Sequence, residues 1–220
     1  MGIGSRLLSI KERLPSDVGL VAVSKFHPPE AIREAYEAGH RIFGESKVLE
    51  LQAKYQALPK DIEWHFIGHL QTNKVKIIAP FISLIHGIDS LKLLKEVDKH
   101  ADKNNRIISC LLQIHIAKEE SKFGFDPDEC RNMLLSDDYK SLKNIAVVGL
   151  MGMATFTDNE KQIRKEFQQL HSLFDELKKD FFSNSPSFKE LSMGMSDDYP
   201  IAVEEGSTLI RVGTSIFGKR

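Results

Sequence analysis

The feature that most constrains the fold is a regular alternation of short β-branched runs with amphipathic helical stretches along the whole chain. The first unit joins the run at 20–23 to a helical stretch that opens at Pro28-Pro29-Glu30 and closes at Gly39. Further runs follow at residues 41–43, 63–67, 83–85, 107–116, 145–150, 190–192 and 209–212. About eight such units without a Pro/Ser-rich linker favour an α/β fold of one compact (β/α)8 barrel. A doubly wound open sheet is the alternative, and in either case we expect residues 1–220 to form a single domain.

Two helices stand out from this alternation. The longest follows the run at 145–150, and its apolar residues recur alternately four and three apart, so they share one face: Ile163, Phe167, Leu170, Phe174, Leu177 and Phe181. Thr157 followed by Glu160 predicts a capping box at its start. Residues 3–14 predict an extra N-terminal helix before the first strand.

Charge and cysteine content exclude several classes of function. Lys plus Arg total 30 against 31 Asp plus Glu, so a net charge of −1 gives no attraction to nucleic acid or anionic lipid. The two cysteines, Cys110 and Cys130, do not form a closely spaced metal-ligand pair, and we expect no metal site. No apolar run approaches the roughly 18 residues of a membrane span, and the N-terminus lacks a secretory signal. We expect a cytoplasmic monomer with no nucleic-acid or membrane partner.

In a parallel barrel the functional groups lie just after each strand, and Lys25 directly follows the first run. An ammonium group at the mouth of an apolar barrel is partly desolvated, which lowers its pKa and frees the amine to attack an aldehyde. A solvated loop lysine is the alternative interpretation of the same position.

The last two loops are rich in Gly, Ser and Thr, as at 192–196 and 211–215. Backbone N–H groups in such loops can cradle a phosphate, and barrels often hold phosphate after strands seven and eight. The alternative is a pair of tight turns with a capping serine. Barrel closure would bring Lys25, on strand one, next to these loops.

Several motifs in order make the chain resemble the pyridoxal phosphate homeostasis protein family: Val21-Ala22-Val23-Ser24-Lys25, Phe43-Gly44-Glu45, His65 to Lys74, Leu191 to Asp198, and Arg211-Val212-Gly213-Thr214. The resemblance spans nearly the whole chain. It implies a barrel similar to the N-terminal domain of alanine racemase, the barrel of fold type III enzymes of pyridoxal 5'-phosphate (PLP). It also implies PLP binding without an established reaction, and so no catalytic residue.

The resemblance also implies roles for individual residues. Lys25 would hold PLP as a Schiff base and Arg211 would approach the pyridine nitrogen, where a guanidinium group can only donate hydrogen bonds. Ser196, Gly213 and Thr214 would bind the phosphate. We expect four further residues to contribute to the cofactor site: Ser46, His65, Ser192 and Met195.

The chain departs from the family pattern at two positions near the expected ring. Ser46 stands where the pattern has asparagine, and His115 stands where the strand-five segment has asparagine. The serine side chain is shorter, and the histidine titrates near neutral pH, so both change the expected contacts to the ring.

The leading prediction is therefore a PLP-binding protein of intracellular PLP homeostasis, with amino acids and PLP-dependent apoenzymes as candidate partners. An amino-acid racemase or related fold type III enzyme is the first alternative, and a phosphate-ester enzyme that uses Lys25 without PLP is the second. We expect no efficient racemase, because Lys25 serves one face of the cofactor only. The chain ends at Arg220 after its last strand, and its tyrosines fall in predicted helices or at their edges.

Overall fold

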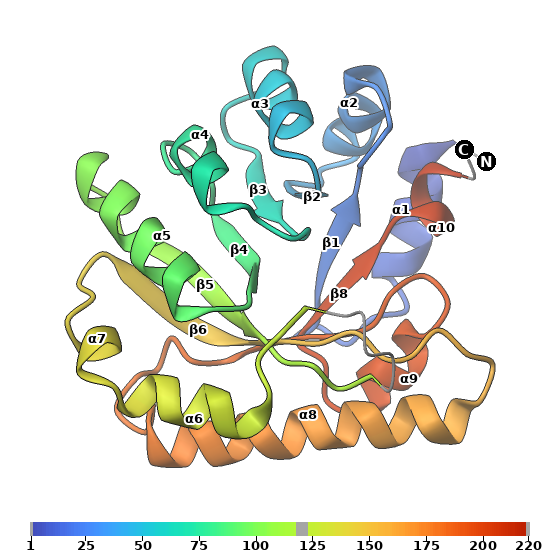
Figure 1. The fold of residues 1–220 in the computed structure, drawn as a ribbon. Coiled ribbons are helices and arrows are strands. Elements are labelled where there is room, and N and C mark those ends of the chain that lie inside the picture. The colour runs from blue at the N-terminus through green and yellow to red at the C-terminus, as the bar shows by residue number, and fades with distance from the viewer. Residues whose placement is uncertain (1, 118–122, 219–220) are drawn as a thin grey trace.

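The structure, a computed structural model, describes residues 2–117 and 123–218, and its centre is a closed barrel of parallel strands (Figure 1). The described residues contain eight strands in chain order around the barrel: β1 (Gly19–Val23), β2 (Ile42–Glu45), β3 (Glu63–Phe66), β4 (Leu84–Ile88), β5 (Ile108–Gln113), β6 (Ile145–Met151), β7 (Glu190–Ser192) and β8 (Leu209–Val212). The barrel closes where β8 pairs with β1, with Val21 opposite Arg211. The predicted (β/α)8 barrel is confirmed, and the open sheet is excluded.

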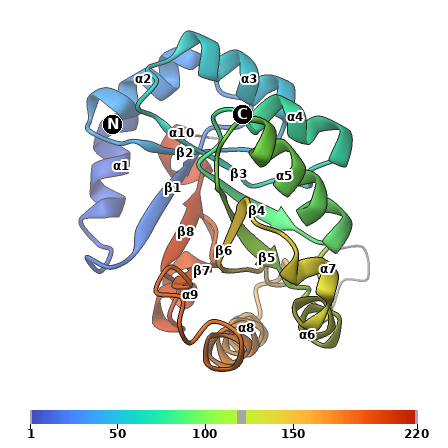
Figure 2. The same cartoon turned by 90° about the vertical axis from the view of Figure 1, so that its left-hand side faces the viewer.

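Helices surround this barrel: α1 (Ile3–Lys11), α2 (Pro29–Glu37), α3 (Val48–Ala57), the 3-10 turn η1 (Thr72–Lys74), α4 (Val75–Ile78), α5 (Leu91–Lys103), α6 (Pro127–Leu135), α7 (Asp137–Lys140), α8 (Glu160–Asp180), α9 (Tyr199–Glu204) and α10 (Thr214–Phe217). Figure 2 shows α2 to α5 arching around one side of the strands while α6, α8 and α9 cover the other. None of these helices, within the part of the chain that is described, combines the length and apolarity needed to cross a membrane.

Two apolar layers follow from the alternation of side chains along each strand. One set points into the barrel and packs there as a small cluster: Val21, Leu84, Leu111, Met151 and Leu209. Neighbouring residues point outward and join the large core beneath the helices, as Ala22, Phe43 and Trp64 do. Because the inward residues alternate with outward ones, a polar residue at an inward position lies inside the barrel and needs a partner there.

The structure corrects the prediction for the start of the longest helix. The cap of α8 is Asn159, whose side chain accepts a hydrogen bond from the N–H of Gln162 at 3.3 Å. Thr157 Oγ1 instead accepts from the N–H of Asn159 at 3.2 Å, so it shapes the preceding turn and is not the cap. The predicted apolar face is confirmed: Ile163, Phe167, Leu170, Phe174 and Leu177 are buried, and Phe181, just past the helix end, is partly buried.

Two short helices lie near the chain end. Helix α9 begins at Tyr199 and leaves Ser196 in a loop. The short helix α10 follows β8 and packs beside α1, where Arg6 Nε donates to the carbonyl of Ile216 at 2.6 Å. Figure 1 accordingly shows α1 and α10 side by side.

Candidate functional site

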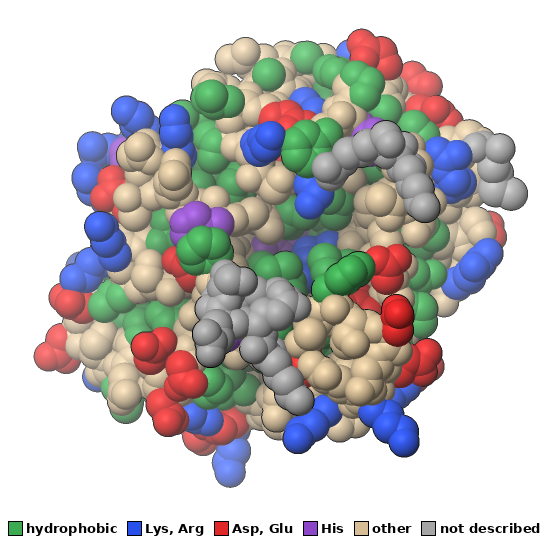
Figure 3. Space-filling model, turned by 45° about the vertical axis from the view of Figure 1, so that its right-hand side comes forward, with side chains coloured by type: hydrophobic (Ala, Val, Ile, Leu, Met, Phe, Trp, Pro, Cys, Tyr) green, Lys and Arg blue, Asp and Glu red, His purple; other side chains and the backbone are tan. Residues whose placement is uncertain are grey.

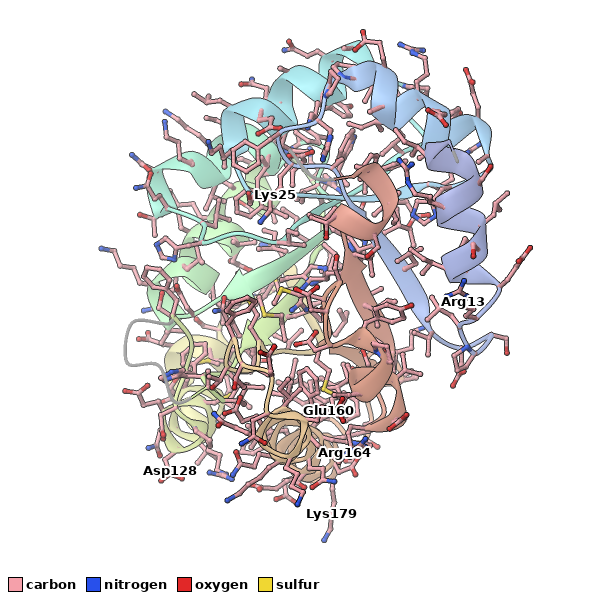
Figure 4. The ribbon with its side chains drawn as sticks, turned by 90° about the vertical axis from the view of Figure 1, so that its right-hand side faces the viewer. Arg13, Lys25, Asp128, Glu160, Arg164 and Lys179 are labelled. Carbon is pink, nitrogen blue, oxygen red and sulfur yellow. The ribbon has the colours of Figure 1, made fainter. Side chains whose placement is uncertain are left out.

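Three adjacent strands, β7, β8 and β1, end on the same face of the barrel and bring most of the predicted residues together. Lys25 follows β1, Met195 and Ser196 follow β7, and Gly213 and Thr214 follow β8. Figure 3 shows a face hollowed at its centre, with basic and histidine side chains visible in its depth. In Figure 4, Lys25 lies at the level of α10 and apart from the residues labelled on α8.

Close backbone approach fixes the loop after β8 against the end of β1. A Cβ added at Gly213 would lie 3.1 Å from the carbonyl oxygen of Val23, tighter than almost all real contacts. Ser196 Oγ accepts a hydrogen bond from the Gly213 N–H at 3.3 Å and so ties the β7 loop to the β8 loop. The ring of His27 stacks on Phe217 with centroids 5.0 Å apart. The loops after β7 and β8 are therefore held against the end of β1, which Lys25 follows.

The loop after β7 is a tight turn whose shape depends on Gly194. This glycine has φ of +92°, in the left-handed region, and a Cβ there would lie 2.6 Å from the Cβ of Ala202. Asp198 Oδ1 accepts from the N–H of Met195 at 2.6 Å, which closes the turn. Burial raises the pKa of Asp198. The carbonyl of Gly194 accepts from the N–H of Arg211, so the turn is fixed to β8.

Arg211 is buried inside the barrel beneath this loop. Its Nη1 donates to the carbonyl of Ser192 at 2.9 Å and to Ser192 Oγ at 2.5 Å, and its Nη2 donates to the carbonyl of Gly152 at 3.0 Å. These bonds use three of the five guanidinium N–H donors, and no residue among those described accepts from the other two. Burial lowers the pKa of Arg211 to about 10, with Asp198 opposing the shift, so the group stays charged at neutral pH.

A chain of hydrogen bonds continues from Arg211 through the barrel interior. Ser192 Oγ lies 3.0 Å from His86 Nδ1, and His86 Nε2 lies 3.1 Å from His65 Nδ1. Because arginine only donates, Ser192 Oγ accepts from it, whereas the donor directions of the two bonds that continue to His86 and His65 depend on the tautomers of the two rings. Burial lowers the pKa of His86 well below its usual value and that of His65 to about 3, so both rings are neutral.

Two of the predicted residues lie apart from the group beside Lys25. Ser46 follows β2, the strand on the other side of β1, and lines a shallow hollow of about 340 Å³ with His69 and Gln71. His65 lies within β3 and lines a hollow of about 410 Å³ at the end of the barrel where the strands begin. In the described part of the chain, the hydrogen bonds that link His65 to Arg211 run through His86 and Ser192.

Sequence reasoning did not select His86 or the carbonyl of Gly152, which complete the surroundings of Arg211. His86 carried a detectable signal, since it is a polar residue in an otherwise apolar run, but its partner Ser192 is 106 positions away. Met151 and Met153 lie in or against the inner apolar cluster, consistent with packing. Within residues 2–117 and 123–218, no group of three His, Cys, Asp or Glu side chains is arranged to hold a metal ion.

Comparison with known proteins gives a consistent match over the whole chain. The family model described as alanine racemase, N-terminal domain, matches residues 3–220. The pyridoxal phosphate homeostasis protein of Aquifex aeolicus is 41% identical over 203 residues, which is 91% of this chain and 86% of that protein. The protein of the same name from Haemophilus influenzae is 37% identical over 213 residues, covering 96% and 88% of the two chains.

Solved structures match to different degrees. PipY of Synechococcus elongatus PCC7942, solved with PLP bound, is 39% identical, has a TM-score of 0.86, and is matched over 100% of its length and 98% of this chain. Alanine racemase from E. faecalis has a TM-score of 0.73 at 15% identity, and this chain covers 58% of it. The second match concerns the barrel fold alone.

Proposed function

Because the chain belongs to the pyridoxal phosphate homeostasis protein family, we propose that it binds PLP at the hollow face of the barrel and serves intracellular PLP homeostasis. One observation carries the proposal: Lys25, Arg211 and the Ser196–Gly213 contact lie on three adjacent strands, in a chain similar over its length to a PLP-bound relative. The names of the curated relatives describe homeostasis and state no reaction.

We propose that Lys25 holds PLP as a Schiff base. The amine of a lysine condenses with an aldehyde when it is partly desolvated and close to the carbonyl carbon. Lys25 is half-buried and follows a β1 strand whose residues 20–23 are all buried. When bound, PLP supplies an electrophilic aldehyde and a pyridine ring that can accept electrons.

The donors that remain on Arg211 fit the pyridine nitrogen. Arg211 is held rigidly by Ser192 and Gly152, so its two remaining N–H groups have a fixed direction. Since a guanidinium group donates and does not give up its proton, the ring nitrogen would stay unprotonated. We propose that His65 does not contact PLP itself and instead orients His86, which in turn orients Ser192 beside Arg211.

The loops after β7 and β8 fit the phosphate. Ser196 and Thr214 supply hydroxyl groups, and the backbone after Gly213 supplies N–H groups at the start of α10. Met195 is exposed beside them, and we propose that Ser46, which follows β2 next to β1, contributes at the aldehyde end of the site. This arrangement fits a ligand with an anionic end at β7–β8 and an aldehyde near β1.

A visible absorbance titration tests the proposed binding. Adding PLP should produce a visible band that differs from the band of free PLP. This new band should saturate at about one PLP per chain, and it should be absent from Lys25→Ala. A later addition of amino acid should change the band, because the amine of the amino acid competes with Lys25. A spectrum that equals the sum of protein and free PLP at every ratio would contradict the proposal and favour a phosphate-ester function for Lys25.

A further inference from the structure

We propose that Lys54, together with Glu45 and Glu50, positions Lys25 by fixing the backbone on both sides of it. This inference rests on the proposed role of Lys25 in PLP binding. Lys54 lies on α3, 29 residues from Lys25 in the sequence, and neither it nor the two glutamates belongs to the PLP-facing group described above. The three side chains are called the clamp below.

Lys54 is the centre of the clamp. Its side chain is only 5% exposed, and its ammonium group donates to three oxygens: the carbonyl of Ser24 at 2.8 Å, Glu45 Oε1 at 2.6 Å and Glu50 Oε1 at 2.7 Å. An ammonium group has three N–H donors, so this set satisfies it completely. One of those bonds ends on the residue immediately before Lys25.

The two glutamates extend the clamp to both neighbours of Lys25. Glu45 Oε1 accepts from the hydroxyl of Ser24 at 2.6 Å, so Ser24 is held through its carbonyl and its side chain. Glu50 Oε1 accepts from the N–H of Phe26 at 2.5 Å. Lys25 therefore sits between two residues whose backbones bond to the same buried ionic cluster.

The conformation at Phe26 explains why such a clamp is needed. Phe26 has φ of +66°, in the left-handed region that non-glycine residues rarely adopt. A strained backbone of this kind persists only where surrounding contacts hold it, and it often marks a functional site. The bond from Phe26 to Glu50 supplies that contact directly after Lys25.

The chemistry of the clamp favours a positioning role over a purely stabilising one. Glu45 is fully buried and its Oε2 has no hydrogen-bond partner among the described residues. Burial raises the pKa of Glu45, and Lys54 opposes that shift. A buried ion pair with an unsatisfied oxygen contributes little net stability compared with apolar residues of similar size. A contribution to stability therefore does not account for this buried cluster, whereas holding the turn around Lys25 does.

The clamp has a measurable consequence for the reaction of Lys25 with PLP. Releasing the turn moves the amine away from its approach to the aldehyde, and misplacement of about 1 Å costs up to about 100-fold in rate. Lys54→Met should therefore slow the appearance of the visible band by roughly 10- to 100-fold. The exposed Lys60, near the end of the same helix, provides the control Lys60→Met, which should react at the wild-type rate.

The deciding experiment compares Lys54→Met in two backgrounds. PLP affinity, measured by fluorescence quenching, should fall with Lys54→Met when Lys25 is present and stay within twofold when Lys25→Ala has already removed the amine. Equal weakening in both backgrounds would mean a general structural role and would overturn the proposal. A wild-type protein that shows no Lys25-dependent band would overturn the proposed function instead.

A milder pair of substitutions covers the case in which Lys54→Met does not fold. The Glu50 side chain is 22% exposed, so Glu50→Leu is tolerable for folding yet removes the acceptor for the Phe26 N–H. Glu50→Gln keeps an oxygen acceptor at the same position. We expect Glu50→Leu to slow band formation and Glu50→Gln to restore most of the rate. Identical rates for the two variants would contradict the clamp.

Discussion

Replacing Ser192 with alanine removes the hydroxyl group that joins Arg211 to His86. The variant loses a charge-assisted bond of 2.5 Å from Arg211 and a neutral bond of 3.0 Å to His86. Hydrogen bonds to charged groups contribute about 1.5–3 kcal/mol and neutral ones about 0.5–1.5 kcal/mol. Arg211 keeps its bond to the Ser192 carbonyl, which offsets part of the loss. We expect the free energy of unfolding to fall by about 2–3 kcal/mol.

Ser207 provides a matched control, because it is equally buried and lies outside the Arg211 chain. Its hydroxyl donates to the carbonyls of Leu191 and Met193 at 3.2 and 2.8 Å. Ser207→Ala should cost about 1 kcal/mol, since one neutral donor is lost. Only Ser192→Ala should weaken PLP binding, by about tenfold, because it alone removes one of the three hydrogen bonds that orient the Arg211 guanidinium.

Thermal unfolding and PLP titration of the two variants measure both effects. At about 2–4 °C per kcal/mol for a chain of this size, Ser192→Ala should lower Tm by roughly 4–12 °C. Ser207→Ala should lower Tm less and leave PLP affinity within about twofold. A Ser192→Ala variant that matches wild type in both measurements would contradict this role of Ser192, and so would equal weakening of PLP binding by the two serine variants.

Three further outcomes follow from the same structure. Burial lowers the pKa of His40 to about 4, so between pH 6.5 and 4 the unfolded chain binds a proton that the folded chain does not, and stability falls as pH falls. In urea melts, His40→Gln should reduce the pH dependence of the free energy of unfolding by about 1.4 kcal/mol per pH unit. An unchanged pH dependence would mean that the pKa of His40 is not lowered in the folded chain. Gly213→Val should weaken PLP binding more than Ser196→Ala, because a Cβ at Gly213 pushes the loop away from Val23; equal affinities would contradict this placement. PLP-loaded protein incubated with L-alanine should leave the optical purity of the amino acid unchanged by chiral chromatography, whereas rapid Lys25-dependent loss would indicate a racemase.

Local patterns in the sequence were sufficient to predict the order of the strands and helices and the position of Lys25 directly after the first strand. Each strand is a short apolar run bounded by turn residues, so its place could be predicted within a few positions. Strand order in a parallel barrel follows chain order, so the sequence alone placed Lys25 and the β7 and β8 loops on adjacent strands. Helix ends were less predictable, because Thr157 and Asn159 are both acceptable caps and only geometry decides between them.

The interior of the barrel could not be predicted from local patterns. Bonds from His86 to Ser192 and from Lys54 to Ser24 join residues 106 and 30 positions apart, and they depend on strand register and on the angle of α3. The sequence predicts His65 at the cofactor site, within a third strand run that spans residues 63–67. The strand continues to Phe66, so His65 remains inside the barrel. These polar residues act through partners that only the closed barrel brings together.

Borohydride trapping with peptide mapping tests the central claim most directly. The PLP-loaded wild-type protein, the Lys25→Ala variant and a sample without PLP are reduced and digested, and the pyridoxyl group is located by mass spectrometry. We predict a single stoichiometric label on Lys25 in the wild type and none in Lys25→Ala. A label on Lys54, Lys74 or another lysine in the wild type, or no label at all, would contradict the claim that Lys25 holds PLP.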